Sequence, residues 1–205
     1  MTEEFTDAGV NDKVVAFHGH MCPGLAIGMR VAEVALNEIG PHAHDEEVVA
    51  VVETDMCGVD AIQFLTGCTF GKGNLIHLDY GKNAFSFYRR SDGKAIRIVT
   101  NPKSFGYPDR EWDDLMAKLS TEGLSPDEEQ RFQQKKDERT RLILEAPLKD
   151  LFKVEQPSRP APRSARIHAS LTCEECGERV MESRIRIFGG RNLCIPCFEL
   201  HEKKW

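Results

Sequence analysis

The sequence predicts an α+β protein with a core domain over residues 1–153, a linker over 154–166 and a small metal-binding domain over 167–205. Three observations support this division. The first part alternates amphipathic helix patterns with short β-branched runs. The segment VEQPSRPAPRSAR is rich in proline and arginine and nearly devoid of apolar residues, which is typical of a linker. Two Cys-x-x-Cys pairs follow it in a segment small enough to need a metal for stability.

The clearest element of the core is a helix over Pro23–Ile39. Proline suits its first turn, and Gly40-Pro41 ends the pattern. Its apolar positions recur three or four residues apart, at Leu25, Met29, Ala32, Leu36 and Ile39. The pattern therefore predicts one continuous buried face.

The remainder of the core predicts a buried strand, a short helix and a strand meander. EVVAVVE at 47–53 is a β-branched run, and VDAIQFLTG at 59–67 is a short helix pattern closed by glycine. Three further strands are expected at 75–80, 84–89 and 95–100. Turn signals at 81–83 and 91–93 separate these strands, so hairpin connections and antiparallel pairing are expected.

Two helices are expected at the end of the core. The first covers 109–119. The second begins at Ser125-Pro126-Asp127-Glu128, a capping-box sequence with proline in the first turn, and continues through Leu144. It is highly charged throughout, so we interpret it as a solvated helix rather than a binding surface.

Charge and hydropathy restrict the classes of partner. The net charge is −6, divided as −8 over residues 1–153 and +2 over 154–205, so only the tail favours an anionic partner such as nucleic acid. No apolar run approaches the roughly 20 residues of a membrane span, and the acidic start MTEEFTDAG is unlike a signal peptide. We therefore expect a cytoplasmic protein, in which seven cysteines indicate metal or redox chemistry more than disulfides.

The tail carries the stronger metal signal. Its two pairs, separated by 17 residues, supply the four thiolates Cys173, Cys176, Cys194 and Cys197. Four cysteines in this spacing predict a tetrahedral structural zinc site with no open position, with a rubredoxin-like iron site or an iron–sulfur cluster as the alternative. The segment also resembles treble-clef fingers found in bacterial regulators of RNA polymerase. Exposed arginines are usually only solvated, but four of them could contact a phosphate or an acidic protein group: Arg179, Arg184, Arg186 and Arg191.

The second candidate site is FHGHMCPG at 17–24. Alternate side chains of an extended segment point the same way, so His18, His20 and Cys22 could converge on one side. Cys22 would also lie at the N-cap of the Pro23 helix, where free N–H groups and the helix dipole favour a thiolate. The motif fits half of a transition-metal site or a nucleophile with its base. Backbone-capping histidines and a buried cysteine are an equally good interpretation.

Two further cysteines favour the site interpretation. Cys57 lies between the 47–53 strand and the next helix, and Cys68 lies in a glycine-rich turn. Cysteine with histidine suits zinc, nickel, copper or iron, and a Cys22–Cys57 redox pair is a second possibility. The turn GCTFGKGN lacks the spacing of a Walker loop, so a plain tight turn is preferred to an anion site. His42 and His44 are interpreted as exposed loop residues.

Together, FHGHMCPGLAIGMRVAEVAL, DMCGVDAIQFLTGCTFGKGNL and the finger resemble the E-type subunit of formylmethanofuran dehydrogenase and its stand-alone relatives. The resemblance covers about Phe17 to Tyr107, and the linker and finger match the two-domain members. It implies an α+β core with an antiparallel sheet, often paired as a homodimer, and a treble-clef zinc domain. It also implies a pocket where the two cysteine motifs meet, with a metal bound there in some members.

Carried over by position, the resemblance implies a core site formed by His18, His20, Cys22, Cys57 and Cys68. Cys22, His20 and Cys57 rank highest as catalytic candidates, with Cys22 as thiolate ligand or nucleophile and a histidine as ligand or base.

Three hypotheses remain open. The leading one is a metal-binding protein linked to molybdenum or tungsten oxidoreductase metabolism, with oxidoreductase subunits among its partners and a second transition metal in the core. The second is a regulatory or adaptor protein whose finger binds RNA polymerase or nucleic acid. The third is a thiol redox protein.

Overall fold

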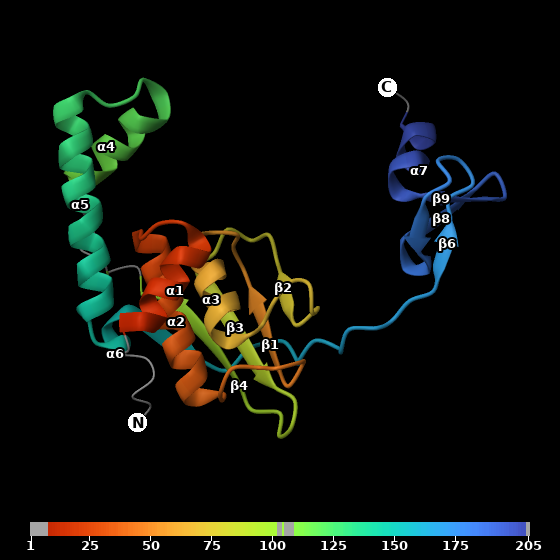
Figure 1. The fold of residues 1–205 in the computed structure, drawn as a ribbon, viewed down its shortest axis with the longest axis horizontal. Coiled ribbons are helices and arrows are strands. Elements are labelled where there is room, and N and C mark those ends of the chain that lie inside the picture. The colour runs from red at the N-terminus through yellow and green to blue at the C-terminus, as the bar shows by residue number, and fades with distance from the viewer. Residues whose placement is uncertain (1–7, 102–103, 105–108, 204–205) are drawn as a thin grey trace. The chain divides into compact units, whose positions relative to one another are not determined.

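The computed structural model describes residues 8–101, 104 and 109–203. The chain forms two compact units, Met1–Ser164 and Ala165–Trp205 (Figure 1). Among the described residues, no helix is both long and apolar enough to cross a membrane.

A five-stranded sheet forms the centre of the first unit. Its strands are β1 (Val48–Val52), β2 (Leu75–His77), β3 (Ala84–Arg89), β4 (Ala95–Thr100) and β5 (Phe152–Glu155), in the order β2-β1-β3-β4-β5. The hairpin predicted between β3 and β4 is confirmed. The hairpin predicted between β2 and β3 is wrong, because β1 lies between these two strands in the sheet. The β1–β3 and β4–β5 pairs are antiparallel as well. The β1–β2 pair is parallel, because helix α3 (Gly58–Thr66) makes the crossover between these two strands.

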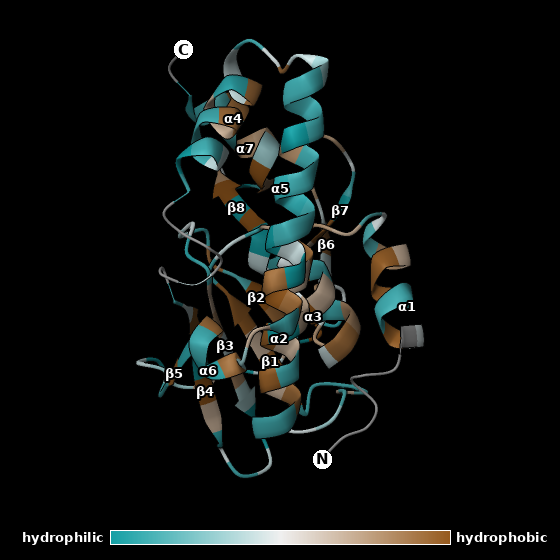
Figure 2. Cartoon of the chain, turned by 90° about the vertical axis from the view of Figure 1, so that its left-hand side faces the viewer, coloured by the Kyte–Doolittle hydropathy of each residue, from teal (hydrophilic) through white to brown (hydrophobic). Residues whose placement is uncertain are grey.

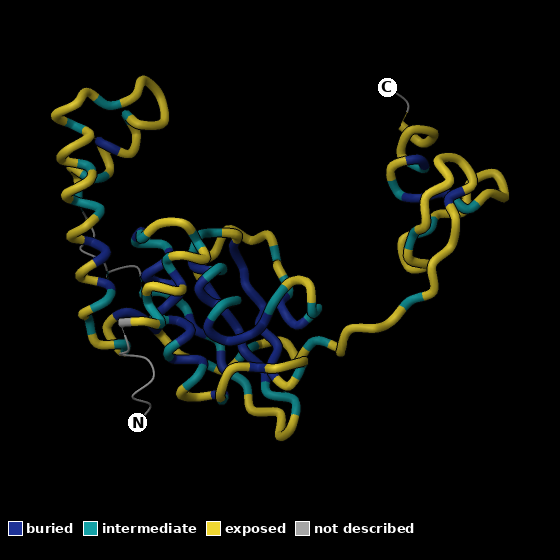
Figure 3. Tube along the Cα trace, viewed as in Figure 1, coloured by how far each residue is buried: buried dark blue, intermediate teal, exposed yellow. Residues whose placement is uncertain are grey.

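Helix α2 (Pro23–Glu38) has two buried faces. Ala26, Val31 and Val34 belong to the hydrophobic core shared with the sheet. On its other side, Leu25 and Met29 pack in a second cluster with residues of α1 (Ala8–His18) and α3. The helix is buried along most of its length, as Figure 3 shows. It therefore connects the sheet to the elements that carry the candidate site.

The crossing of α2 and α3 is unusually close. A Cβ added at Gly28 would lie 2.1 Å from the carbonyl oxygen of Gly58, the first residue of α3. A Cβ at Gly24, one turn earlier, would lie 3.2 Å from Cβ of Cys57. Glycine at these two positions lets the start of α3 rest directly on the first turns of α2.

A helical hairpin of α4 (Arg110–Thr121) and α5 (Pro126–Glu145) follows the sheet (Figure 1). The capping box predicted at Ser125 is confirmed, with the Ser125 N–H donating to the Glu128 carboxylate at 2.9 Å. Trp112 stacks on Phe132 at 5.1 Å between ring centroids, and the Arg139 guanidinium lies 4.3 Å from the Trp112 ring. Most of α5 is hydrophilic, in agreement with the solvated helix expected (Figure 2).

Two further expectations from the sequence are wrong in this unit. The residues up to His18 are not extended but form α1, so alternation does not align His18 with Cys22. The segment 154–166 is not wholly a linker, because Val154 and Glu155 pair with β4. The chain then stays on the sheet, where Tyr88 Oη donates to the Arg159 carbonyl at 3.2 Å. Buried polar groups on this face of the sheet need partners, and this segment supplies them.

The second unit is a small treble-clef finger. Strands β6 (Ser170–Thr172) and β7 (Arg179–Met181) form one hairpin, and β8 (Ile185–Phe188) and β9 (Arg191–Cys194) form another. A short 3-10 turn, η2 (Glu182–Arg184), connects the hairpins, and α7 (Ile195–Glu202) follows. The helices of the first unit also include the short α6 (Leu148–Leu151), which directly precedes β5.

Gly28→Ala is expected to destabilise the first unit by about 1–3 kcal/mol, because the new methyl group would force α3 away from α2. Chemical unfolding followed by circular dichroism measures the effect. Gly71→Ala is the matched control, since nothing lies within 4 Å of a Cβ at that position. Equal stability of the two variants would show that the α2–α3 contact is not close in solution.

Candidate metal centre

Three potential ligands from different helices meet at one point of the first unit. One ligand atom each from His18, Cys22 and Cys57 lies within 4.8 Å of the other two. His18 ends α1, while Cys22 and Cys57 are the N-cap residues of α2 and α3. The cysteines therefore come together because the two helices cross at their first turns.

The backbone around Gly19 directs His18 into this group. Gly19 has φ +99°, a conformation that favours glycine, and its N–H bonds the Val15 carbonyl at 2.7 Å. The chain thus leaves α1 sharply and reaches Cys22, whose Sγ accepts the Leu25 N–H at 3.3 Å. The N-cap position expected for Cys22 is confirmed.

Asp60 orients the His18 ring. Nδ1 of His18 lies 2.7 Å from Oδ2 of Asp60, and because an ionised carboxylate only accepts, Nδ1 carries the proton. The other nitrogen, Nε2, is buried and has no hydrogen-bond partner. Leaving a buried acceptor unpaired costs about 1–3 kcal/mol, so such atoms indicate a missing partner.

The donor set fits a soft or borderline transition metal. One imidazole nitrogen and two thiolates are ligands that zinc prefers, and a tetrahedral ion separates its ligand atoms by roughly 3.5–3.8 Å, so small side-chain movements would suffice. Carboxylate–histidine–metal arrangements hold the ligating ring in this way. Burial, and secondly the adjacent Cys22, raise the pKa of Cys57, as expected for two thiols that share a small space without a cation.

A cavity of about 370 Å³ lies beside two of the three residues, His18 and Cys57. His18, Cys57 and Asp60 line one side of it, and Thr54, Asp55 and His77 are among the residues that line the remainder. Three protein ligands leave one position of a tetrahedral ion open. A small molecule in this cavity would therefore lie within reach of an ion held by the group.

Two candidates from the sequence are not part of this group. His20 is exposed, and its ring centroid lies 4.7 Å from that of His18. Cys68 is fully buried in the core and its Sγ donates to the Val48 carbonyl at 3.5 Å, so it has a packing role. Asp60 was not singled out from the sequence, although its place three residues after Cys57, in the first turn of α3, was a usable signal.

The four tail cysteines form a second and different cluster. One ligand atom each from Cys173, Cys176, Cys194 and Cys197 lies within 4.8 Å of the others. The N–H groups of Cys176 and then Cys194 lower the pKa of Cys173 to about 6. All four positions of a tetrahedral ion would be filled, so this cluster fits a structural zinc.

Asp60→Asn is expected to weaken metal binding by the core about 10- to 100-fold, because the amide no longer fixes the His18 tautomer. Competition with a chromogenic chelator measures the affinity. Asp55→Asn is the matched control, since Asp55 lines the same cavity without contacting His18. Equal affinities for both variants would remove Asp60 from the site.

Cys176→Ser is expected to release the tail metal and unfold the finger, because small zinc modules are folded only with metal. The core should unfold at an unchanged temperature. Two-dimensional NMR of the full chain separates the two effects. A finger that keeps dispersed signals in this variant, or after chelation, would contradict a structural zinc.

Comparison with known proteins identifies the family of each unit. The family model described as FmdE, molybdenum formylmethanofuran dehydrogenase operon, matches residues 17–153, and the prokaryotic dksA/traR C4-type zinc finger matches 166–203. The solved structure of a tungsten formylmethanofuran dehydrogenase FmdE-like protein from Syntrophus aciditrophicus shares the fold, with a TM-score of 0.59 and 24% identity over 95% of this chain and 91% of that one.

A curated relative from Archaeoglobus fulgidus, named as a probable S-adenosyl-L-methionine-binding protein, is 35% identical over 192 residues. The match covers 88% of this chain but only 50% of that protein, so this chain spans about half of the relative's length. The family model, in contrast, accounts for most of the first unit. The chain belongs to the FmdE family and carries a C4 zinc finger of the dksA/traR type.

Proposed function

We propose that the core binds one transition-metal ion through His18 Nε2, Cys22 Sγ and Cys57 Sγ, and presents it to a small molecule in the adjoining cavity. The carrying observation is the buried, unpartnered Nε2 of a histidine whose Nδ1 is held by Asp60. A cysteine whose thiol only fills space in a hydrophobic core does not need an oriented histidine beside it. The combination of an oriented imidazole with two thiols is better accounted for by an ion than by packing.

When bound, an ion of this class supplies Lewis acidity at its open position. Side chains of the protein would orient the ligating histidine, bind the small molecule and exchange protons with it. Asp60 keeps His18 in the ligating tautomer. Asp55 and His77 are exposed at the cavity and can accept or donate a proton, while Thr54 offers a hydroxyl to a polar ligand. This set fits a small polar molecule that binds the ion and exchanges a proton with the protein.

The biological context that we propose is oxidoreductase metabolism based on molybdenum or tungsten. The support is the description of the matching family and the name of the similar solved structure. The chain would serve there as a cytoplasmic metal-binding subunit or accessory protein, alone or as a homodimer. In this proposal, methanofuran chemistry itself belongs to other subunits.

The ligand named for the Archaeoglobus relative is not included in this proposal. Half of that protein has no counterpart in this chain, and its ligand can belong to that half. Calorimetric titration with S-adenosylmethionine is expected to give no binding to this chain. Stoichiometric binding would assign the ligand to the shared half.

A thiol redox function is the second candidate, because Cys22 and Cys57 are close enough for their sulfurs to approach one another. Burial raises the pKa of Cys57, which lowers its thiolate fraction and opposes rapid exchange. A reversible Cys22–Cys57 disulfide in metal-free protein, detected by mass spectrometry, would support this candidate.

We propose that the finger docks on another macromolecule, either RNA polymerase or nucleic acid. The alternative is a purely structural role. Two observations support docking. The finger is of the dksA/traR type, and it has exposed arginines at Arg179, Arg184 and Arg186. Binding to nucleic acid would weaken steeply with salt.

Cobalt substitution tests the main proposal. With Co²⁺ in both sites, azide is expected to change the visible spectrum, because the core ion has an open position and the tail ion has none. The Cys22→Ser/Cys57→Ser variant should lose that response and keep the tail spectrum. A wild-type spectrum insensitive to azide and to other small ligands would contradict an open core site.

A further inference from the structure

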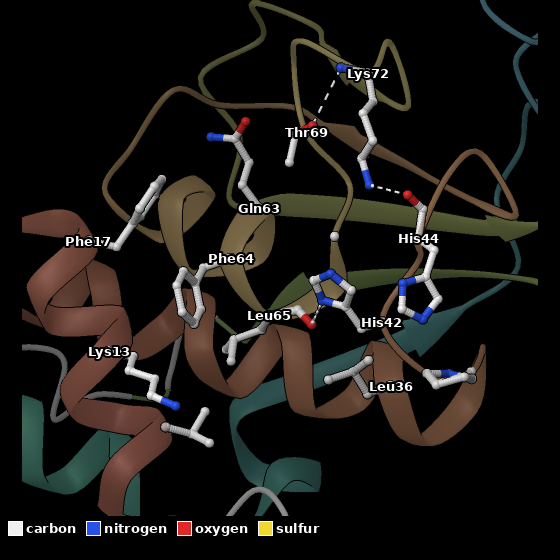
Figure 4. Close-up of a pocket in the computed structure, with 14 residues that line it drawn as sticks. Lys13, Phe17, Leu36, His42, His44, Gln63, Phe64, Leu65, Thr69 and Lys72 are labelled. Atoms are coloured by element: carbon white, nitrogen blue, oxygen red, sulfur yellow. Dashed lines mark hydrogen bonds between the residues drawn. The ribbon is translucent and has the colours of Figure 1, made fainter.

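A larger cavity, of about 1170 Å³, lies on the first unit next to the metal centre. It is bounded by α1, α3, the end of α2 and the loops that carry His42 and Lys72, as Figure 4 shows. Its volume lies somewhat above the range of small-molecule sites, which is about 300–1000 Å³. Neither the metal centre nor the finger uses this cavity.

One end of the cavity is aromatic. Phe17 and Phe64 approach at 5.7 Å between ring centroids with a 47° tilt, and Leu36 and Leu65 extend the apolar wall. Phe17 remains 56% exposed in spite of its size. A planar apolar group placed against this pair would cover surface that the chain itself leaves in contact with water.

Every ionisable side chain that lines the cavity is basic. Of its fourteen residues, four are Lys13, His42, His44 and Lys72, and none is aspartate or glutamate. This basic lining contrasts with the net charge of the whole chain, which is −6. The potential in a concave site follows its own lining more than the net charge, so the cavity favours anions.

The basic groups are held in position by backbone contacts. Lys72 Nζ donates to the carbonyls of Ala43 at 2.9 Å and His44 at 3.4 Å, which leaves one of its three N–H groups for a ligand. Nδ1 of His42 contacts the Leu65 carbonyl at 3.1 Å, so Nδ1 carries the proton. A Cβ at Gly67 would lie 2.7 Å from His42 Nε2, so only glycine lets the imidazole pack at this position.

Glu47 is an acidic group close enough to be influenced by His44 and Lys72, and it does not line the cavity. Its carboxylate accepts the Asp45 N–H at 2.8 Å, and this bond is part of what lowers the pKa of Glu47. His44 and Lys72 also lower it, so they act in part as its counter-ions. Among the described residues, Lys13 has no such acidic partner and therefore carries most of the selectivity for an anion.

We propose that this cavity binds an organic anion with a planar apolar part, the ring lying against Phe17 and Phe64 and the carboxylate or phosphate facing the basic side chains. The site is distinct from the metal cavity, although Gln63 lines both. Gln63 Oε1 accepts the Phe70 N–H at 3.0 Å, so this residue forms the wall between them. The proposal does not depend on metal binding by the core.

Calorimetric titration of the full zinc-loaded chain with 2-naphthoate tests this inference. One molecule is expected to bind per chain, while 2-naphthylmethylammonium and inorganic phosphate, which each lack one half of the recognition, bind at least about tenfold more weakly. Phe17→Ala and Lys13→Glu should each weaken naphthoate binding about five- to tenfold, equivalent to about 1–1.4 kcal/mol. Both residues are exposed, so neither change should unfold the chain.

Three control variants test whether naphthoate binds in this cavity rather than elsewhere on the chain. Lys149→Glu makes the same charge change at an exposed position of α6, and Phe70→Ala removes an exposed phenylalanine that lines the metal cavity but not this one. Both should bind naphthoate like the wild type, as should Cys22→Ser/Cys57→Ser, which lacks the core metal site. Binding lost in either of the last two variants would place the anion at the metal and overturn the proposal.

Two further results would also overturn the inference. Equal affinity for the anion and the ammonium compound would show that the basic lining does not select charge. Sedimentation that reveals a dimer, converted to monomer by Phe17→Ala and unable to bind naphthoate, would show that a second copy of the chain covers this face.

Discussion

The close crossing of α2 and α3 at Gly28 and Gly58 is the constraint on which the candidate site depends. Because no side chain separates the two backbones, the N-caps of both helices lie next to each other. The caps are Cys22 and Cys57, and Asp60 follows in the first turn of α3. A larger residue at position 28 would thus disturb stability and ligand geometry through the same contact.

The two cysteine clusters show how one type of ligand serves two purposes. In the finger, four sulfurs close the coordination sphere and replace a hydrophobic core that so short a segment cannot build. In the core domain, which folds around its own sheet and helices, two of the three candidate ligands, His18 and Cys57, line a cavity. Metal at the first site maintains structure, whereas metal at the second would be available to a ligand.

Much of the fold could be predicted from the sequence because its signals are local. The periodicity of Pro23–Ile39, the β-branched strand at 47–53 and the capping box at Ser125 correspond to α2, β1 and α5 within a few residues. Helix α1 was missed because its apolar residues form only a weak pattern. The end of the sheet was missed because pairing of Val154 depends on the distant β4, which local composition does not reveal.

The candidate site was predicted only in part. The N-cap role of Cys22 could be inferred from the proline and helix pattern that follow it. The proximity of His18, Cys57 and Asp60 depends on how three helices pack. His20 was named because alternate residues of an extended segment point the same way, and that reason does not hold because His18 ends a helix. Cys68 was included for its position at an element boundary, yet its thiol faces the core.

Metal content per chain, measured by inductively coupled plasma mass spectrometry, tests the central claim most directly. The account predicts about two equivalents in the wild type and about one in Cys22→Ser/Cys57→Ser, with the remaining ion in the finger. A single equivalent that is unaffected by the two substitutions, in protein purified with ample metal, would contradict the core metal centre.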